Sequence, residues 1–262
     1  MEEKIRRAAR EMKRRAPGVA FTGSGVSAES GISTYRDRGG LWDSHPKGAS
    51  GGMLGVLAAY PEKAPEILAG FFDSLKAAEP NAGHRAIAAL EEQGILSAVI
   101  TQNVDNLHRL AGSRTVFELH GNIMRLRCLA CGRKTMPSRE EFFALAAELV
   151  SGLSRSGMEG LLSALPSCEC RGTLRPDFVS FGESVQDLPE ASSASQRAGF
   201  MLICGTSGLV YPAASLPFRA KEAGAFIVEV NPRRSELSDI ADVFLQDTAA
   251  KVLPGLWAEI SA

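Results

Sequence analysis

The chain carries the sequence FTGSGVSAESGISTYR at residues 21–36. The apolar residues 19–21 indicate the end of a buried strand, and the pattern Gly23-x-Gly25-x-x-Ala28 predicts a turn from that strand into a helix. Glycine lets the backbone approach a diphosphate closely, and a helix N-terminus directs free N–H groups at it. The stretch therefore predicts a dinucleotide-binding turn, with a tight turn that binds no ligand as the alternative.

The residues that follow argue against an ordinary dehydrogenase. Such an enzyme has an acidic residue about 20 positions further on, at the end of a second strand. Here residues 39–43 have the sequence GGLWD, and the whole segment from 35 to 61 is rich in glycine and has little periodicity. We expect a loop and a short helix there, with no strand to carry the acid.

Composition limits the remaining classes. The 262 residues are enough for one large domain with an inserted module. With 29 basic and 30 acidic residues the chain lacks a global positive field, so we expect no direct binding of nucleic acid. No apolar run approaches about 18 residues and residues 1–4 show no signal-peptide pattern, so we expect no membrane association and a cytoplasmic location.

Strands and helices alternate along the rest of the chain. This alternation predicts an α/β fold with a doubly wound parallel sheet. The expected helices cover residues 2–15, 62–77, 82–92, 139–150, 212–222 and 249–260, and the expected strands after the first cover 97–101, 115–119, 200–204, 225–230 and 243–245.

Polar residues follow several of these strands directly. Gln102, Asn103 and Asp105 follow one, and in a doubly wound sheet such positions line the ligand crevice. Helix capping by Asn103 or Asp105 is the alternative. Gly205, Thr206 and Ser207 follow another strand and Asn231 a third, where hydroxyls and amides can bind phosphate and ribose. For these the alternative is ordinary turn chemistry.

His120 is the one histidine of four that follows a core strand directly. Its pKa lies near working pH, which makes it a candidate general base at the crevice rim. The other three, His45, His84 and His108, are interpreted as structural.

Four of the five cysteines form two close pairs, Cys128 with Cys131 and Cys168 with Cys170. Four thiolates complete a tetrahedral zinc site that is closed and structural. The second pair is one residue shorter than usual, and reduced free thiols are the alternative. Cys204, inside an apolar strand, is interpreted as an inert core residue.

Taken together, the motifs resemble those of the sirtuin family, the NAD-dependent protein lysine deacylases. Five blocks match in order across nearly the whole chain: GSGVS at 23–27 with SGI at 30–32, QNVDNLH at 102–108, LHG at 119–121, FGE at 181–183, and GTS at 205–207 with Asn231. The resemblance implies a Rossmann-like NAD-binding domain formed by residues 1–36, 94–123 and 176–262. It also implies a cofactor loop and helical insertion at 37–93 and a small zinc-ribbon module at 124–175.

The resemblance also implies site roles. His120 would deprotonate a ribose hydroxyl after nicotinamide has left, and Asn103 would orient the ribose or a water. Asp105 with Ile32 would hold the nicotinamide carboxamide. Residues 179–183 would pair with an extended acyl-lysine peptide as an added strand. The remaining expected NAD contacts are Gly23, Ser24, Gly25, Tyr35, Arg36, Gln102, Gly205, Thr206, Ser207 and Asn231.

Some residues depart from the family pattern. Ser24, Ser33 and Tyr35 stand where the family usually has alanine, proline and phenylalanine. Sirtuins that remove succinyl or malonyl groups resemble one another in a tyrosine and an arginine on a helix, and the corresponding positions here are Leu68 and Phe71, counted back from residues 80–84. Neither can pair with a carboxylate, so the resemblance implies acetyl or longer apolar acyl substrates. The alternative is that Leu68 and Phe71 are only core-facing residues of an amphipathic helix.

Three other classes share parts of this pattern. An ADP-ribosyltransferase or NAD glycohydrolase is the closest alternative, because it releases nicotinamide without needing acyl-lysine. A hydride-transfer dehydrogenase would use the same turn, and a zinc-ribbon scaffold would bind NAD weakly or not at all.

Overall fold

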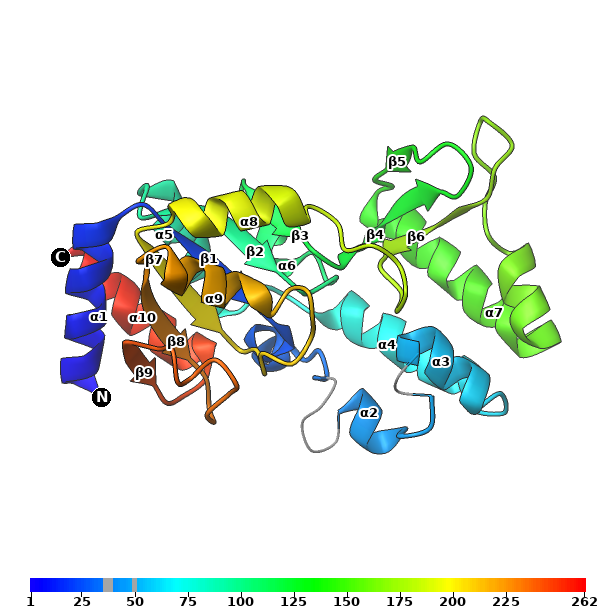
Figure 1. Cartoon of the computed structure of the whole chain (residues 1–262). Coiled ribbons are helices and arrows are strands. Elements are labelled where there is room, and N and C mark those ends of the chain that lie inside the picture. Colours follow the sequence, from blue (N-terminus) through cyan, green and yellow to red (C-terminus); the bar gives the residue numbers. More distant parts are fainter. Residues whose placement is uncertain (35–39, 49–50) are drawn as a thin grey trace. The chain divides into compact units, whose positions relative to one another are not determined.

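The computed structural model of the chain describes residues 1–34, 40–48 and 51–262. Tyr35 and Arg36, two of the expected NAD contacts, lie outside the described residues. The chain divides into two compact units (Figure 1). The large unit contains residues 1–30, 79–120 and 185–262, and the small unit contains residues 31–78 and 121–184.

The large unit is built on a parallel sheet of six strands in the order β3-β2-β1-β7-β8-β9. Each neighbouring pair is parallel, which confirms the doubly wound α/β fold expected from the alternation of strands and helices. The strands are β1 Gly18–Thr22, β2 Leu96–Thr101, β3 Val116–Glu118, β7 Phe200–Cys204, β8 Phe226–Val230 and β9 Val243–Leu245.

Helices cover both faces of this sheet because its central strands are apolar on both sides. All five residues of β1 are buried, with Ala20 in one apolar cluster and its neighbours Val19 and Phe21 in the other. One cluster receives side chains from α1 Glu2–Arg15, α5 Ala82–Glu92 and α10 Ala249–Ser261, and the other from α8 Leu188–Arg197 and α9 Ser215–Glu222. The short helix α6 Leu107–Leu110 follows β2.

The prediction that Gly23-x-Gly25-x-x-Ala28 leads into a helix is wrong. The chain instead forms two 3₁₀ turns, Ser24–Val26 and Ala28–Ser30. The N–H of Gly25 donates to the carbonyl of Gly205 on a neighbouring loop, and Gly31 has a φ of +86° that ends the second turn. Tertiary contacts therefore override the helical pattern, and the turn has no long helix dipole behind it.

In the residues that the structure describes, the small unit combines a three-stranded antiparallel sheet with four helices. Its strands lie in the order β5-β4-β6, and its longest helix, α7, extends 13 residues beyond the expected end at residue 150. Ser156 and Gly157 have non-helical dihedral angles that break α7 near its C-terminal end. The elements are α2 Leu41–Ser44, α3 Gly52–Ala59, α4 Ala64–Ala77, β4 Gly121–Cys128, β5 Lys134–Thr135, α7 Arg139–Ser163 and β6 Leu174–Phe178.

The two units divide the chain differently from the expected domains. Residues 79–93, assigned to the helical insertion, belong to the large unit. The reason is the apolar face of α5, because Ala86, Ile87 and Leu90 are buried in the same cluster as α1 and α10. Among the described helices, none is long and apolar enough to span a bilayer.

Candidate active site

Two glycine-rich loops of the large unit lie in close contact at the carboxyl ends of β1 and β7. A Cβ atom at Gly23 would lie 2.8 Å from the carbonyl oxygen of Gly205, and one at Gly25 would lie 2.8 Å from the Gly205 Cα. The Gly25 N–H donates to the Gly205 carbonyl over 2.8 Å. These glycines are therefore required by loop packing, which brings the turn after β1 beside Thr206.

Ser27, at the end of this turn, is the centre of a hydrogen-bond network. Its hydroxyl donates to Oδ2 of Asp105 over 2.7 Å and accepts from Nδ2 of Asn103 over 3.0 Å. Ser27 is fully buried. One hydroxyl of the glycine-rich turn thus orients Asn103 and Asp105, two of the three polar residues expected at the end of β2.

The amide of Asn103 has a single orientation in this network. Nδ2 donates to Ser27 and to the carbonyl of Gly23, and the backbone N–H donates to Oγ1 of Thr101. Both amide hydrogens are thereby used within the protein. Asn103 consequently offers Oδ1 as an acceptor for a hydroxyl or a water.

Asp105 caps α6 as well as binding Ser27. Its Oδ1 accepts from the N–H of Leu107 over 2.9 Å, so the capping interpretation holds for this residue. Burial raises the pKa of the Asp105 carboxyl, while the hydrogen bonds from Leu107 and Ser27 oppose that rise. A carboxyl in this position can act as an acceptor toward a bound amide or as a donor when protonated.

Two buried histidines support the same strand ends. Nε2 of His108 lies 2.9 Å from Oγ1 of Thr22, which donates in turn to Oγ1 of Thr101. Nε2 of His84 lies 3.4 Å from the Ser27 hydroxyl, and the two rings are 4.9 Å apart. Burial lowers the pKa of His84 to about 4 and holds that of His108 well below its ordinary value, so both rings are neutral at pH 7. They are structural, as expected, but they hold site residues in place.

Asn81 connects this network to α5. Its Oδ1 accepts from the N–H groups of Gly83 and His84 at the helix N-terminus, and its Nδ2 donates to the carbonyl of Val26 and to Ser30. A capping residue thus fixes both a helix end and the glycine-rich turn.

His120 follows β3, and its Nδ1 lies 2.9 Å from the carbonyl oxygen of Gln102. A carbonyl accepts only, so Nδ1 carries the proton and the lone pair is on Nε2. Burial lowers the pKa of His120, and the hydrogen bond to Gln102 opposes that shift. The ring is therefore neutral at pH 7 with Nε2 ready to accept a proton.

A third group of polar residues lies at the ends of β7 and β8. Oγ1 of Thr206 accepts from the Gln102 side chain over 3.0 Å, and Nδ2 of Asn231 donates to the Thr206 carbonyl over 2.8 Å. Asn231 also lies 3.4 Å from Oε1 of Glu229, which accepts from the Ser235 hydroxyl over 2.6 Å. The side chain of Glu229 is completely buried.

In the small unit, the four expected cysteine ligands meet. Their sulfur atoms all lie within 4.8 Å of one another, with Cys128 and Cys170 at 3.5 Å and Cys131 and Cys168 at 3.8 Å. A tetrahedral zinc with Zn–S bonds of about 2.3 Å separates its sulfurs by about 3.8 Å. The N–H of Cys131 lowers the pKa of Cys128 to about 6, which favours the thiolate. The donor set therefore fits zinc, including the shortened second pair.

The structure brings together most of the predicted site in the large unit. The turn after β1 lies with the ends of β2, β7 and β8, and His120 contacts the end of β2 through Gln102. Ile32 is half-buried and belongs to the small unit, and Cys204 is buried as expected. No site role was expected for Thr22, Thr101 or Glu229, although each is a polar residue in a largely apolar, buried strand.

Known proteins resemble this chain over nearly its whole length. A model described as the Sir2 family matches residues 23–212. The chain belongs to the Sir2 family. Relatives of the Sir2 chain include an NAD-dependent protein deacylase of Desulfosudis oleivorans, which is 39% identical over 99% of this chain and 97% of that protein. Another, from Thermococcus kodakarensis, is 43% identical over 95% of this chain and 93% of that protein.

Solved structures agree with the Sir2 assignment. A Sir2 homolog in complex with NAD has a TM-score of 0.77 and 36% identity, and covers 97% of this chain and 93% of that one. A Sir2 complex with a p53 peptide and NAD⁺ has a TM-score of 0.76 and 30% identity, over 97% of each chain.

Proposed function

We propose that this Sir2 chain removes acetyl or longer apolar acyl groups from protein lysine in a reaction that consumes NAD and releases nicotinamide. The observation that carries the proposal is the neutral His120 ring. Its Nε2 is the basic nitrogen, and the Asn103 network contacts the same end of β2. A base and a fixed acceptor at adjoining strand ends suit the handling of a ribose hydroxyl.

NAD would supply an electrophilic ribose carbon, which the acyl oxygen attacks as nicotinamide leaves. His120 would then accept the proton of a ribose hydroxyl at Nε2, and that oxygen would take the acyl group from the lysine. Asn103 would hold a hydroxyl or a water through Oδ1. The lysine amine would leave with the proton that His120 took up, and one water would add to the acyl carbon, whose bond to the oxygen on the attacked ribose carbon then breaks. The products would be free lysine, nicotinamide and O-acyl-ADP-ribose.

The remaining polar residues would bind the rest of NAD. Gly23, Ser24, Gly25, Thr206, Ser207 and Asn231 would face its phosphates and riboses, supported by the packing of the two glycine-rich loops. Asp105 and Ile32 would hold the nicotinamide amide. The roles of Tyr35 and Arg36 rest on the family resemblance alone.

The peptide would pair with residues 179–183, which follow β6 in the small unit. Main-chain hydrogen bonds of an added strand supply affinity with little sequence selectivity. For the acyl group, α4 presents Leu68 and Phe71 three positions apart and on one face of the helix. Leu68 is buried and Phe71 packs against Phe72, with ring centroids 5.6 Å apart. The apolar pair Leu68 and Phe71 favours an uncharged acyl group.

Zinc would hold the small unit together without taking part in the reaction, because four thiolates leave no open position for a water. We also propose the cytoplasm as the compartment. Reduced thiolates persist there, and the four cysteine ligands depend on them.

One experiment separates this function from its alternatives. Nicotinamide release is measured with and without an acetyl-lysine peptide, together with the absorbance of reduced cofactor. The proposal expects release that depends on the acylated peptide and no reduced cofactor. Release without any peptide would instead establish an NAD glycohydrolase, and reduced cofactor would establish a dehydrogenase.

A further inference from the structure

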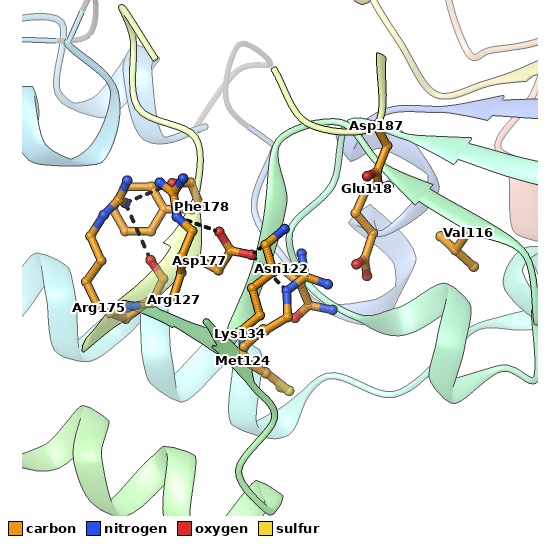
Figure 2. Close-up of polar contacts among 12 residues, drawn as sticks. Val116, Glu118, Asn122, Met124, Arg127, Lys134, Arg175, Asp177, Phe178 and Asp187 are labelled. Atoms are coloured by element: carbon orange, nitrogen blue, oxygen red, sulfur yellow. Dashed lines mark hydrogen bonds and ion pairs between the residues drawn. The ribbon is translucent and has the colours of Figure 1, made fainter. Parts of the chain in front are cut away.

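The small unit contains a buried carboxylate compensated by three cations. Asp177 in β6 is completely buried and accepts from Arg125 over 2.8 Å, with Arg127 at 3.2 Å and Lys134 at 3.4 Å. The cations come from β4 and β5, so the charges link all three strands of this sheet (Figure 2). A buried charge paired in this way anchors its neighbours firmly.

A second carboxylate, Glu183, connects to the same cluster from the segment after β6. One guanidinium nitrogen of Arg175 lies within 2.6 Å of both Glu183 oxygens, and Arg127 reaches Oε2 over 3.4 Å. The Arg175 side chain is only 13% exposed. Arg127 thus bridges the buried Asp177 and the more exposed Glu183.

Arg175 and Glu183 also bind the backbone at both ends of residues 178–183, a stretch that contains the peptide-binding segment 179–183. Arg175 donates to the carbonyl of Phe178 over 2.9 Å and stacks on the Phe178 ring at 5.1 Å (Figure 2). Glu183 Oε2 accepts from the N–H of Ser180, and the Glu183 N–H donates back to the Ser180 carbonyl. Gly182, with a φ of +90°, permits this tight turn.

We propose that Arg175 and Glu183 are positioning residues that hold the backbone of segment 179–183 in the conformation that pairs with the acyl-lysine peptide. This inference rests on the proposed function, in which that segment is the peptide-binding strand. A strand-addition surface takes its affinity from backbone groups, and ordering those groups before binding reduces the entropy lost on association. Neither side chain needs to touch the peptide, and neither takes part in NAD binding.

The test compares KM values for an acetyl-lysine peptide and for NAD, both from nicotinamide release, and the peptide Kd by calorimetry. Glu183→Gln and Arg175→Gln should each raise the peptide KM and Kd by roughly tenfold. The KM for NAD should stay within about twofold. Because both variants break the shared Arg175–Glu183 contact, the effect of the double variant should be smaller than the product of the two single effects.

Glu11→Gln is the matched control. Glu11 in α1 also accepts from two arginines, Arg14 over 2.6 Å and Arg15 over 3.2 Å, but it lies in the large unit on a helix with no expected role in binding. It should leave both KM values unchanged. Arg175→Lys keeps the charge but loses the guanidinium fork, so its peptide KM should lie between those of the unaltered protein and Arg175→Gln.

Three results would overturn the inference. The first is an unchanged peptide KM in folded Glu183→Gln, and the second is a double variant whose effect is the product of the two single effects. The third is that the KM for the peptide and the KM for NAD rise together in all the variants, including Arg175→Lys, and that the thermal midpoint falls. This result would mean that the network only supports the fold. If the unaltered protein shows no peptide-dependent nicotinamide release, the proposed function fails and this inference fails with it.

Discussion

His120 has one ring nitrogen available for chemistry, because Nδ1 is committed to the carbonyl of Gln102. Replacing His120 with alanine should therefore lower nicotinamide-coupled deacylation at least roughly 100-fold, the lower end of general-base contributions. The thermal midpoint should hardly change, since the ring makes a single hydrogen bond to the backbone. Activity is measured with a saturating acetyl-lysine peptide, and a folded variant that retains activity would disprove the assignment.

The dependence of activity on pH reports the protonation of His120. A base must be unprotonated to act, and burial lowers the pKa of His120 from its ordinary value near 6.5. Activity should therefore be lost only as the pH falls below 6.5, with the midpoint of the acid limb of kcat/KM under that value. The measurement is kcat/KM against pH, and a midpoint at 7 or above would contradict the neutral, buried ring.

At the scale of single residues, candidate site residues that directly follow a strand were easier to predict from the sequence than those that lie inside a strand. His120, Asn103 and Asp105 stand directly after apolar runs, where the topology of a parallel sheet brings polar groups together. Ser27 lies in the turn after β1 and Glu229 lies within β8, so neither directly follows an apolar run. Their importance comes from contacts with Asp105 and Asn231, which depend on the distance between two loops rather than on position along one.

The cysteine cluster belongs to the scale of elements, because its ligands come from separate parts of the small unit. Cys128 ends β4 and Cys131 lies in the turn before β5, while the loop before β6 supplies Cys168 and Cys170. Cys131→Ser should reduce zinc below one per chain and lower the thermal midpoint of the small unit, since metal binding and folding are coupled in such modules. Cys204→Ala, in β7 of the large unit, should keep one zinc. Elemental analysis decides this, and fully active protein without metal would refute the site.

Two apolar residues of helix α4 lead to a prediction about the acyl group. Leu68 and Phe71 offer no partner for a carboxylate, and burying that charge unpaired costs several kcal/mol. Acetyl-lysine and myristoyl-lysine peptides should therefore turn over at least roughly tenfold faster than the succinyl peptide. Leu68→Tyr with Phe71→Arg should raise succinyl turnover. Succinyl turnover equal to acetyl turnover in the unaltered chain would mean that another residue charges the pocket.

Elements with strong apolar periodicity were predicted closely, and those set by tertiary contacts were not. The helix at 82–92 agrees with α5 to the residue, because its apolar stripe and its Asn81 cap are both local. The turn after β1 was expected to be helical and is not, since Gly25 bonds to Gly205 some 180 residues later. α8 was missed, because its sequence LPEASSASQR is mostly small and polar.

The stability of the whole molecule should depend on pH through His84 and His108. Burial lowers the pKa of His84 to about 4, so between pH 6.5 and 4 the unfolded chain binds a proton that the folded chain does not. The free energy of unfolding should then fall as the pH drops through that window, by up to about 3 kcal/mol for His84 alone. Asp105, with its raised pKa, acts in the opposite direction.

Denaturant unfolding from pH 7.5 to 4 measures this dependence. His84→Gln should be less stable than the unaltered chain at pH 7.5, because it loses the cap contact with Asn81, but its stability should fall less toward pH 4. His45→Gln serves as the control, because His45 lies outside the network and packs against Tyr60. An identical slope in His84→Gln and the unaltered chain would rule out this histidine as the cause.

The division of the molecule into units was harder to predict than its sheet. Alternating strands and helices determine a doubly wound fold, but the boundary between units depends on which apolar faces meet. Asn81 shows the difficulty, because it lies in a stretch assigned to the insertion and yet binds Val26 and Ser30 of the large unit.

The order of strands in the large sheet also determines when the chain can fold during its synthesis. β1 is central, and its Val19 pairs with Met201 of β7. The ribosome adds the intervening residues, about 180 of them, in roughly 10 to 35 s. Throughout that time one edge of an apolar strand has no partner, which makes it a template for aggregation. The nascent chain is therefore exposed to aggregation through this edge of β1 until β7 has been synthesised.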